Sequence, residues 1–444
     1  MLALRSRILT AQGLLIVAVV FGGGGSGAGI ANLVVQLAAL GALAYHRDAF
    51  AEFFNEAPRA LSVVVGVTVA LPLMQCIPLP PAVWHLLPGR IVVEQSIVLI
   101  GEQDNWMPIS LNLNRTIIAF LALVPPLAIL ILTWRCTFRD SWSLLAVLVT
   151  CCVFCIVLGA QQLALGNREL MLYSEGANSQ GLRGTFANRN TAGLFIDIGL
   201  CALVGLLWRP RQSVLRMGVG FGVALLLGLG LVLTQSRSSM TLVVVPVVMF
   251  LFYLWTVRVT FLEHRARLLA LIVTVAVIFG AVAMLGSNAR VQRSLSRFDT
   301  LEDARPAIWQ DAQSSISRFW PVGSGIGTFD EVFQLDESLE NLSPGRAARA
   351  HNEYLETMVE SGAIAPFLIV LWAVTIVVLA WRGIRREVGR GSQAAALAIF
   401  ILLAFQSILD YPLRSQALLC VAAMALGIFM ARSAHESLVA RELR

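Results

Sequence analysis

Long apolar stretches alternate with short polar ones along almost the whole chain. Apolar runs near 18 residues or more predict transmembrane helices, because a helix satisfies its own backbone N–H and C=O groups in lipid. The pattern therefore predicts an all-α integral membrane protein with about twelve spans. We place them at 8–22, 26–44, 60–79, 116–134, 142–161, 191–208, 217–234, 240–257, 268–286, 365–381, 394–409 and 415–431.

Composition agrees with this pattern. Of the 444 residues, 57% are hydrophobic and only 14% are charged, whereas soluble domains have about 25% charged residues. All 33 basic residues are arginines, whose planar fork binds phosphate at two points. No basic patch has interleaved aromatic residues, so nucleic acid is not an expected partner. Cys152 and Cys155 form a CxxC inside an apolar run, which we interpret as packing rather than metal binding or redox chemistry.

The distribution of arginine predicts the orientation. If the N-terminus is cytoplasmic, the segments on that side hold 19 of the 33 arginines. By the positive-inside rule, both termini are then cytoplasmic and the longest polar segment is periplasmic. We expect a multi-pass protein of the bacterial inner membrane in three parts. These are residues 1–286 with nine spans and two shorter periplasmic loops (80–115 and 162–190), a large periplasmic loop over 287–364, and residues 365–444 with three spans and a cytoplasmic tail.

The large loop carries most of the candidate chemistry. A helix is predicted from Arg305, with proline at the favourable first position, and it ends before Pro321. The glycine-rich run 323–327 follows, which we interpret as a turn, with a phosphate cradle of backbone N–H groups as the alternative. A second helix is predicted over 350–362, with His351 in its first turn.

His351 is the candidate general base, because histidine takes up a proton near neutral pH and this one lies among many arginines. His85, in the loop 80–115, is the rival base, but no comparable arginine cluster surrounds it. We expect Trp84 and Trp106 of that loop to lie at the membrane surface as aromatic anchors.

Polar residues also occur at or near the ends of three spans. Arg237 lies in a short outer turn and is either an interfacial arginine or an anion ligand. Asp197 lies two turns inside a span and seven residues after Asn190, so the two share a helix face. We favour an arginine-paired structural role for Asp197 over catalysis. Asp410 lies in another short outer turn.

Several of these pieces together resemble a known family. They are Gly-Thr-Phe-Ala-Asn-Arg-Asn at 184–190, Ser236-Arg237, Arg305 with Trp309, Gly-Ile-Gly-Thr-Phe at 325–329, and His-Asn-Glu-Tyr-Leu at 351–355 before Glu360-Ser361-Gly362. In this order and spacing, over roughly residues 180–380, they resemble the O-antigen ligase and O-antigen/exopolysaccharide polymerase superfamily.

The resemblance implies a GT-C-like, inverting glycosyltransferase that needs neither metal nor cofactor. Its donor would be a glycan on undecaprenyl pyrophosphate, held among membrane lipids. By motif, Arg237 and Arg305 would bind the pyrophosphate and His351 would be the catalytic base. The supporting or substrate-binding residues would be Asn188, Asn190, Asn352, Tyr354, Asp197 and Asp410.

The sequence leaves the acceptor open. In a ligase the acceptor is a sugar of the lipid A core, and in a polymerase it is another lipid-linked repeat. Two alternatives from other classes are a transporter or flippase of lipid-linked sugars and a scaffold in envelope assembly. A transporter needs charges along a path through the membrane, whereas Asp197 is essentially the only deep charge here.

Overall fold

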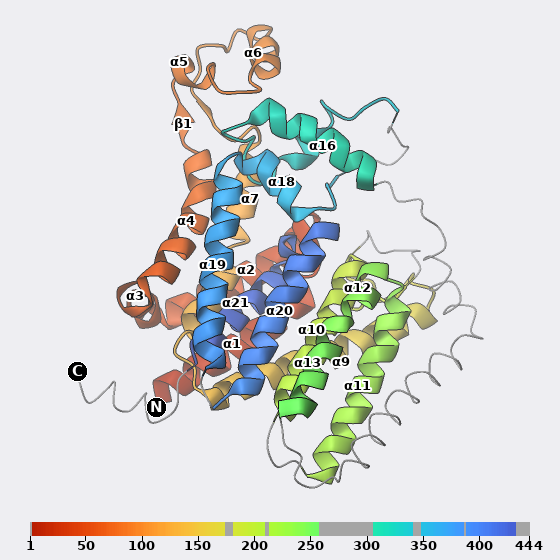
Figure 1. The fold of residues 1–444 in the computed structure, drawn as a ribbon. Helices are drawn as coiled ribbons and strands as arrows, with labels where there is room; N and C mark the ends of the chain where they lie inside the picture. The colour runs from red at the N-terminus through yellow and green to blue at the C-terminus, as the bar shows by residue number, and fades with distance from the viewer. Residues whose placement is uncertain are drawn as a thin grey trace.

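The protein is a bundle of long helices with a cap of shorter elements at one end (Figure 1). The computed structural model describes residues 2–173, 181–208, 213–256, 305–340, 348–385 and 388–431. In these ranges the bundle consists of α1 (Leu2–Phe21), α2 (Gly29–Tyr45), α4 (Arg59–Gln75), α7 (Leu113–Leu121), α8 (Val124–Thr133), α9 (Phe138–Ala164), α10 (Arg189–Leu207), α11 (Val214–Thr234), α12 (Arg237–Leu242), α13 (Val244–Thr256), α19 (Ile364–Ile384), α20 (Arg390–Leu409) and α21 (Gln416–Phe429).

The number of spans differs from the prediction. Eight helical segments of the described chain are long and apolar enough to cross a membrane, and a ninth is counted if α2 and α3 (Arg47–Glu56), bent by 81°, form one span. The helices α4 and α21 are apolar but have only 17 and 14 residues. The protein is therefore a multi-pass membrane protein, but the count of twelve is not confirmed. The expected span 268–286 lies outside the described residues.

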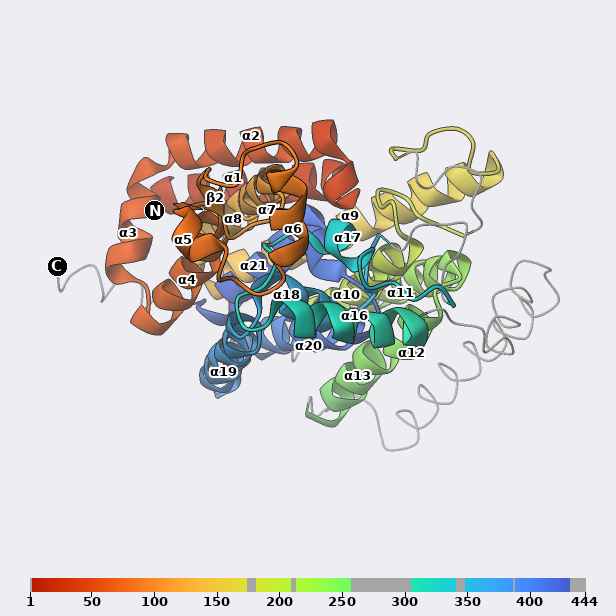
Figure 2. The ribbon, with the colours of Figure 1, turned by 90° about the horizontal axis from the view of Figure 1, so that it is seen from above.

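The cap covers one end of the bundle (Figures 1 and 2). Its elements are β1 (Pro78–Leu79), α5 (Pro81–Trp84), α6 (Ile91–Val98), β2 (Met107–Pro108), α16 (Arg305–Phe319), α17 (Phe329–Phe333) and α18 (Glu353–Ser361). The expected helix that ends before Pro321 is observed as α16, over Arg305–Phe319. The strands β1 and β2 pair antiparallel, Pro78 with Pro108. Trp84 is fully buried and donates its indole N–H to the carbonyl of Asn105 at 2.9 Å, so the expectation of a membrane anchor was wrong for it.

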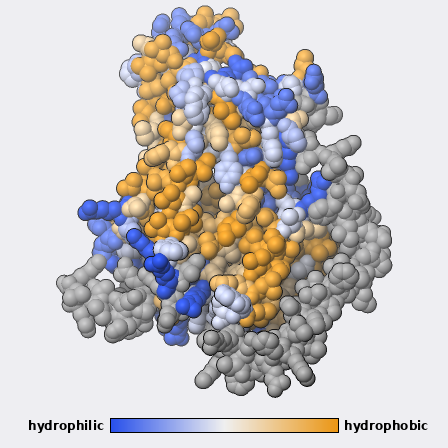
Figure 3. Space-filling view, viewed as in Figure 1, coloured by the Kyte–Doolittle hydropathy of each residue, from blue (hydrophilic) through white to orange (hydrophobic). Residues whose placement is uncertain are grey.

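Apolar side chains cover much of the middle of the bundle on the face seen in Figure 3. On α19, for example, Phe367, Val370, Val374 and Val377 are all more than half exposed. Such a surface is costly in water and suits the hydrocarbon core of a bilayer. The view shows the more hydrophilic residues mainly at the ends of the molecule.

Ion pairs join three segments at the end of the bundle opposite the cap. Arg7 of α1 pairs with Asp48 and Glu52 of α3, and Arg135 pairs with Glu52 as well. These residues lie in the segments 1–7, 45–59 and 135–140, three of those that the arginine distribution assigns to the cytoplasmic side. The contacts are those expected if all three segments lie at one membrane face.

The helix α10 lies at the centre of the bundle and packs against α9, α11 and α20. Nearly every residue from Thr191 to Gly205 is buried. Viewed from the cap, α16 and α18 lie over α10 and α20 (Figure 2). The ends of α10 and α20 that meet beneath the cap carry most of the candidate site.

Candidate functional site

His351 was predicted to lie in the first turn of a helix. In the structure it lies just before Asn352, the N-cap of α18. The residue that caps the helix is Asn352, whose side-chain oxygen accepts hydrogen bonds from the backbone N–H groups of Tyr354 and Leu355. An asparagine in this position favours the start of a helix, because its side-chain oxygen is an acceptor for N–H groups of the first turn that have no backbone partner. The helix therefore begins after the cap, and His351 belongs to the segment that leads into it.

The backbone of His351 has an unusual conformation. Its φ is 48°, in the left-handed region that few residues other than glycine adopt. The preceding carbonyl, that of Ala350, accepts the indole N–H of Trp309 at 2.9 Å, which ties this segment to α16. Strained backbone persists only where the surroundings hold it, and such positions concentrate at functional sites.

The imidazole of His351 contacts a buried carboxylate. Its Nδ1 lies 3.3 Å from Oδ1 of Asp410, which is only 1% exposed. When Nδ1–H donates to the carboxylate, Nε2 keeps a lone pair that can accept a proton. Nε2 has no hydrogen-bond partner in the described part of the chain. The pair thus has the arrangement of a base and the group that orients it.

Two asparagines from the start of α10 hold the carboxylate. The side-chain amides of Asn188 and Asn190 donate to Oδ2 of Asp410 at 3.1 and 2.8 Å. The backbone N–H of Tyr411 donates to Oδ1 at 3.0 Å. Asn188 is also the N-cap of α10, so the start of this helix and the end of α20 are fixed relative to each other. The structure therefore places both asparagines, which the resemblance named as supporting residues, against Asp410.

The turn that carries Arg237 lies next to this network. Ser236 caps α12, and Ser239 donates its hydroxyl to the carbonyl of Asn190 at 3.2 Å. On the other side, the amide of Gln406 donates to the hydroxyl of Ser238 at 3.1 Å. Gln406 is on α20, one turn before Asp410. The half-buried Arg237 thus belongs to a turn that is bonded to both helices of the site.

Arg305 belongs to the cap. It is the first residue of α16, is half-buried, and lies one turn before Trp309, so the two share a helix face. Trp309 is the residue that contacts the segment before His351. One end of α16 also lies above α12 in both ribbon views (Figures 1 and 2).

The two remaining predicted residues, Tyr354 and Asp197, differ in their contacts. Tyr354 donates its hydroxyl to the carbonyl of Ala404 at 3.0 Å, which ties α18 to α20. Asp197 is fully buried in α10, and neither of its carboxyl oxygens has a hydrogen-bond partner among the described residues. No arginine of the described ranges pairs with it, so the expected ion pair is not observed.

The glycine-rich run 323–327 forms a turn, which was the preferred interpretation, and most of its backbone N–H groups already donate hydrogen bonds. Ser324 and Gly325 donate their backbone N–H groups to the carbonyls of Val359 and Glu360, and Ile326 donates to the side chain of Gln75. These groups hold the cap together and are not available to cradle a phosphate. His85 has Glu94 at 3.8 Å, within the projecting part of the cap that carries α5 and α6.

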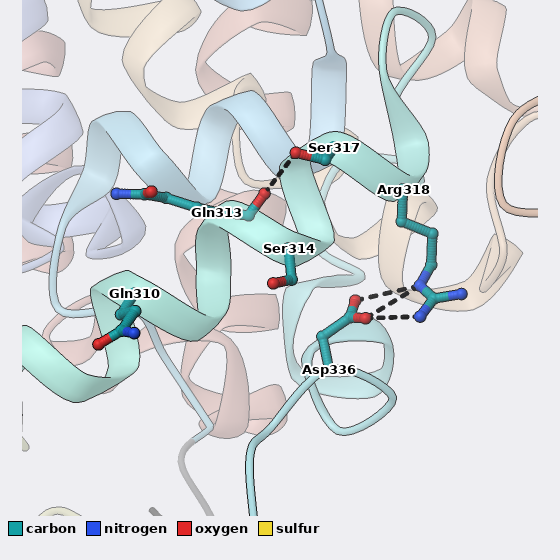
Figure 4. Close-up of a pocket in the computed structure, with 6 residues that line it drawn as sticks. All are labelled: Gln310, Gln313, Ser314, Ser317, Arg318 and Asp336. Atoms are coloured by element: carbon teal, nitrogen blue, oxygen red, sulfur yellow. Dashed lines mark hydrogen bonds and ion pairs between the residues drawn. The ribbon is translucent and has the colours of Figure 1, made fainter.

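A shallow groove of about 690 Å³ lies on α16 (Figure 4). It is lined by Gln310, Gln313, Ser314, Ser317, Arg318 and Asp336. These residues are on the face of α16 opposite to Ala312 and Phe319, which are buried in the core of the cap. The groove is therefore separate from the His351 site.

One comparison with known proteins bears on this site. Residues 221–373 match the family model described as O-antigen ligase. The resemblance to the O-antigen ligase superfamily is thereby confirmed. The matched range of this ligase domain contains Arg237, Arg305 and His351, whereas Asn190 and Asp410 lie outside it. A search of curated proteins found no match.

The match supports a glycan-processing membrane protein of the O-antigen ligase or polymerase type. Sequence reasoning missed three residues of the site. The ring of Tyr411 lies 5.2 Å from that of His351, and Ser239 and Gln406 connect the Arg237 turn to the asparagines and to α20. The signal for Tyr411 was its place directly after Asp410 in a polar turn between spans.

Proposed function

We propose that this ligase-like protein is a glycosyltransferase of the inner membrane that works at the periplasmic face. It transfers a glycan from undecaprenyl pyrophosphate to a sugar hydroxyl of the acceptor, without a metal ion. The observation that carries this proposal is the contact between His351 and Asp410, beside the segments of Arg237 and Arg305. With a ligase domain as the family match, a sugar of the lipid A core is the first acceptor to test.

The reaction is a single in-line displacement. The acceptor oxygen attacks the anomeric carbon of the donor, a new glycosidic bond forms, and the bond from that carbon to the phosphate oxygen breaks. The electron pair leaves with undecaprenyl pyrophosphate, and the hydroxyl proton passes to Nε2 of His351. One displacement inverts the anomeric centre. A positioned base contributes roughly 10²–10⁴-fold to the rate.

Negative charge builds up on the departing pyrophosphate, so the site needs fixed positive charge. Arg237 and Arg305 supply guanidinium groups from two different elements, α12 and α16. A guanidinium contacts phosphate oxygens in pairs, and it acts more strongly in a site with little water. The apolar helices around the site hold the polyprenyl chain in lipid, which positions the reacting carbon.

The test uses the purified full-length protein in detergent with EDTA, an undecaprenyl-pyrophosphate-linked glycan and a candidate acceptor. Free undecaprenyl pyrophosphate and the size of the glycan product are measured. We expect carrier release that requires His351 and is insensitive to EDTA. One added block indicates a ligase, and a ladder indicates a polymerase that joins lipid-linked repeats. No release with any acceptor, together with flipping in liposomes, would replace the proposal with transport.

A further inference from the structure

Five charged side chains form a buried cluster behind the His351 site. We call it the charge cluster, and it consists of Arg349, Glu353, Glu356, Glu360 and Arg414. All five side chains are at most 16% exposed. The three glutamates repeat at i, i+3 and i+7 along α18, so they project from one face of the helix. Arg349 and Arg414 approach that face from the two segments on either side.

The cluster is continuous in space. Arg414 lies 2.9 Å from Glu353, 2.8 Å from Glu360 and 3.4 Å from Glu356. Arg349 pairs with Glu356, which also accepts the backbone N–H of Ala350 at 3.3 Å. Glu356 is therefore the one carboxylate in the cluster that contacts both arginines.

The positions of the two arginines in the chain make this arrangement relevant to the site. Arg349 comes two residues before His351, and Arg414 comes four residues after Asp410. The backbone N–H of Leu413 also donates to Glu353 at 3.2 Å. The cluster thus fixes, to the same face of α18, both the segment that carries the imidazole and the segment that carries the carboxylate.

Stability alone does not account for such a cluster. Removing five charges from water has a large desolvation cost, and well-packed apolar residues at buried ion pairs are often as stable or more stable. An apolar contact, however, tolerates sliding, whereas a forked guanidinium that contacts three carboxylates has few alternative positions. A precise distance between two segments is what this arrangement provides best.

We propose that the charge cluster is a positioning device that holds His351 against Asp410, with Glu356 as the residue that links the two segments. This inference rests on the proposed function for its effect on transfer, but the geometric part does not depend on it. When the cluster is weakened, the two segments separate, the imidazole loses its orientation, and the rate falls while substrate binding changes little. The five residues are positioning residues and do not touch the substrate.

The main variant is Glu356→Gln, which keeps the shape of the side chain. The change leaves Arg414 paired with Glu353 and Glu360, so the protein is expected to fold. Arg414→Lys is the second variant, which keeps the charge but loses the fork. The matched control is Asp336→Asn. That carboxylate is also buried and paired with an arginine, Arg318 at 2.6 Å, but it lies on the groove side of α16 (Figure 4).

Two measurements on the full-length protein in detergent test the inference. Hydrogen–deuterium exchange is followed for residues 348–356 and 410–416, and kcat and KM are measured in the transfer assay. For Glu356→Gln we expect faster exchange confined to these two segments. We also expect a loss of kcat of about 10- to 100-fold with the donor KM within about threefold, because small misplacements of reacting groups have effects of this size. Arg414→Lys should change both readouts in the same direction, and Asp336→Asn should change neither.

Unchanged exchange in both segments for both variants would overturn the inference. So would a loss of transfer that appears only in KM, or faster exchange throughout the chain with a matching fall in Tm. If the wild-type protein transfers no glycan at all, the proposed function fails. Exchange that still increases only in the two segments would then support the positioning role separately.

Discussion

The change Asp410→Asn tests the site most directly, because the structure determines how the new side chain would sit. Oδ2 of Asp410 accepts hydrogen bonds from the amides of Asn188 and Asn190. After the substitution, the amide oxygen is the only group that can accept from them, so it takes this position. The new NH₂ group then faces His351 at the position of Oδ1, and the backbone N–H of Tyr411 loses the acceptor that it has there.

The consequence for His351 is a change of tautomer. An NH₂ group donates to Nδ1, so the imidazole proton moves to Nε2, and Nε2 can no longer accept the proton of the acceptor hydroxyl. Loss of a general base reduces rates by roughly 10²–10⁴-fold, and the analogous substitution in the serine-protease triad falls at the upper end of this range. We expect kcat to fall by about 10³-fold while the donor KM changes less than about threefold.

The assay is carrier release from the undecaprenyl-pyrophosphate-linked glycan, with Tm measured in parallel. Because the two side chains have the same shape, the protein should still fold, with a Tm somewhat below that of the wild type because the backbone N–H of Tyr411 loses its acceptor. Asp336→Asn serves again as the control for neutralising a buried carboxylate. A kcat within threefold of the wild type would show that Asp410 does not orient the base, and the reasoning about the site would be wrong.

The other predictions concern the arginines, the base and the charge cluster. His351→Ala and Arg305→Ala should each lower the transfer rate by at least about 100-fold with the fold intact, and retained transfer in both would remove their assigned roles. Arg237→Lys should be poor as well, because a point charge replaces a fork, and full activity would make Arg237 an interfacial arginine only. Burial raises the pKa of the Glu353 carboxyl from 4.5 to about 7. Between these values the folded form holds a proton that the unfolded form has lost, so stability falls as the pH rises from 4.5 through 7, by about 3 kcal/mol at most. Glu353→Gln should therefore flatten the change in Tm between pH 5 and pH 8, and an unchanged pH dependence would contradict this pKa.

The sequence predicted the parts of the fold that periodicity governs. The apolar runs, α16 and the turn at 323–327 follow from hydropathy, a proline at a helix start and glycines, all of which act locally. Sequence reasoning was less reliable about where elements end. It placed His351 inside a helix because the apolar spacing continues through residue 350, whereas the cap at Asn352 decides the boundary.

The sequence could not predict which polar residues meet. Asp410 is 59 residues from His351 and about 220 from Asn188 and Asn190, and no pattern in the chain specifies that they converge. Asp197 shows the opposite failure. As an acid inside a span it was expected to have an arginine partner, but it is buried in α10 at the centre of the bundle, and its carboxyl oxygens have no hydrogen-bond partner among the described residues.

The location of the site nevertheless has a general physical cause. Asn188, Ser236 and Asn352 cap helices, and Asp410 follows the end of α20, so each belongs to a helix terminus. Helix termini leave backbone groups unsatisfied, and in a membrane protein they must therefore lie near the surface of the bilayer or be capped by side chains. Residues that are far apart in the sequence are in this way brought to one plane. A reaction between a lipid-held donor and a water-exposed acceptor requires polar groups in that same plane, so the constraint on folding and the requirement of the chemistry select the same positions.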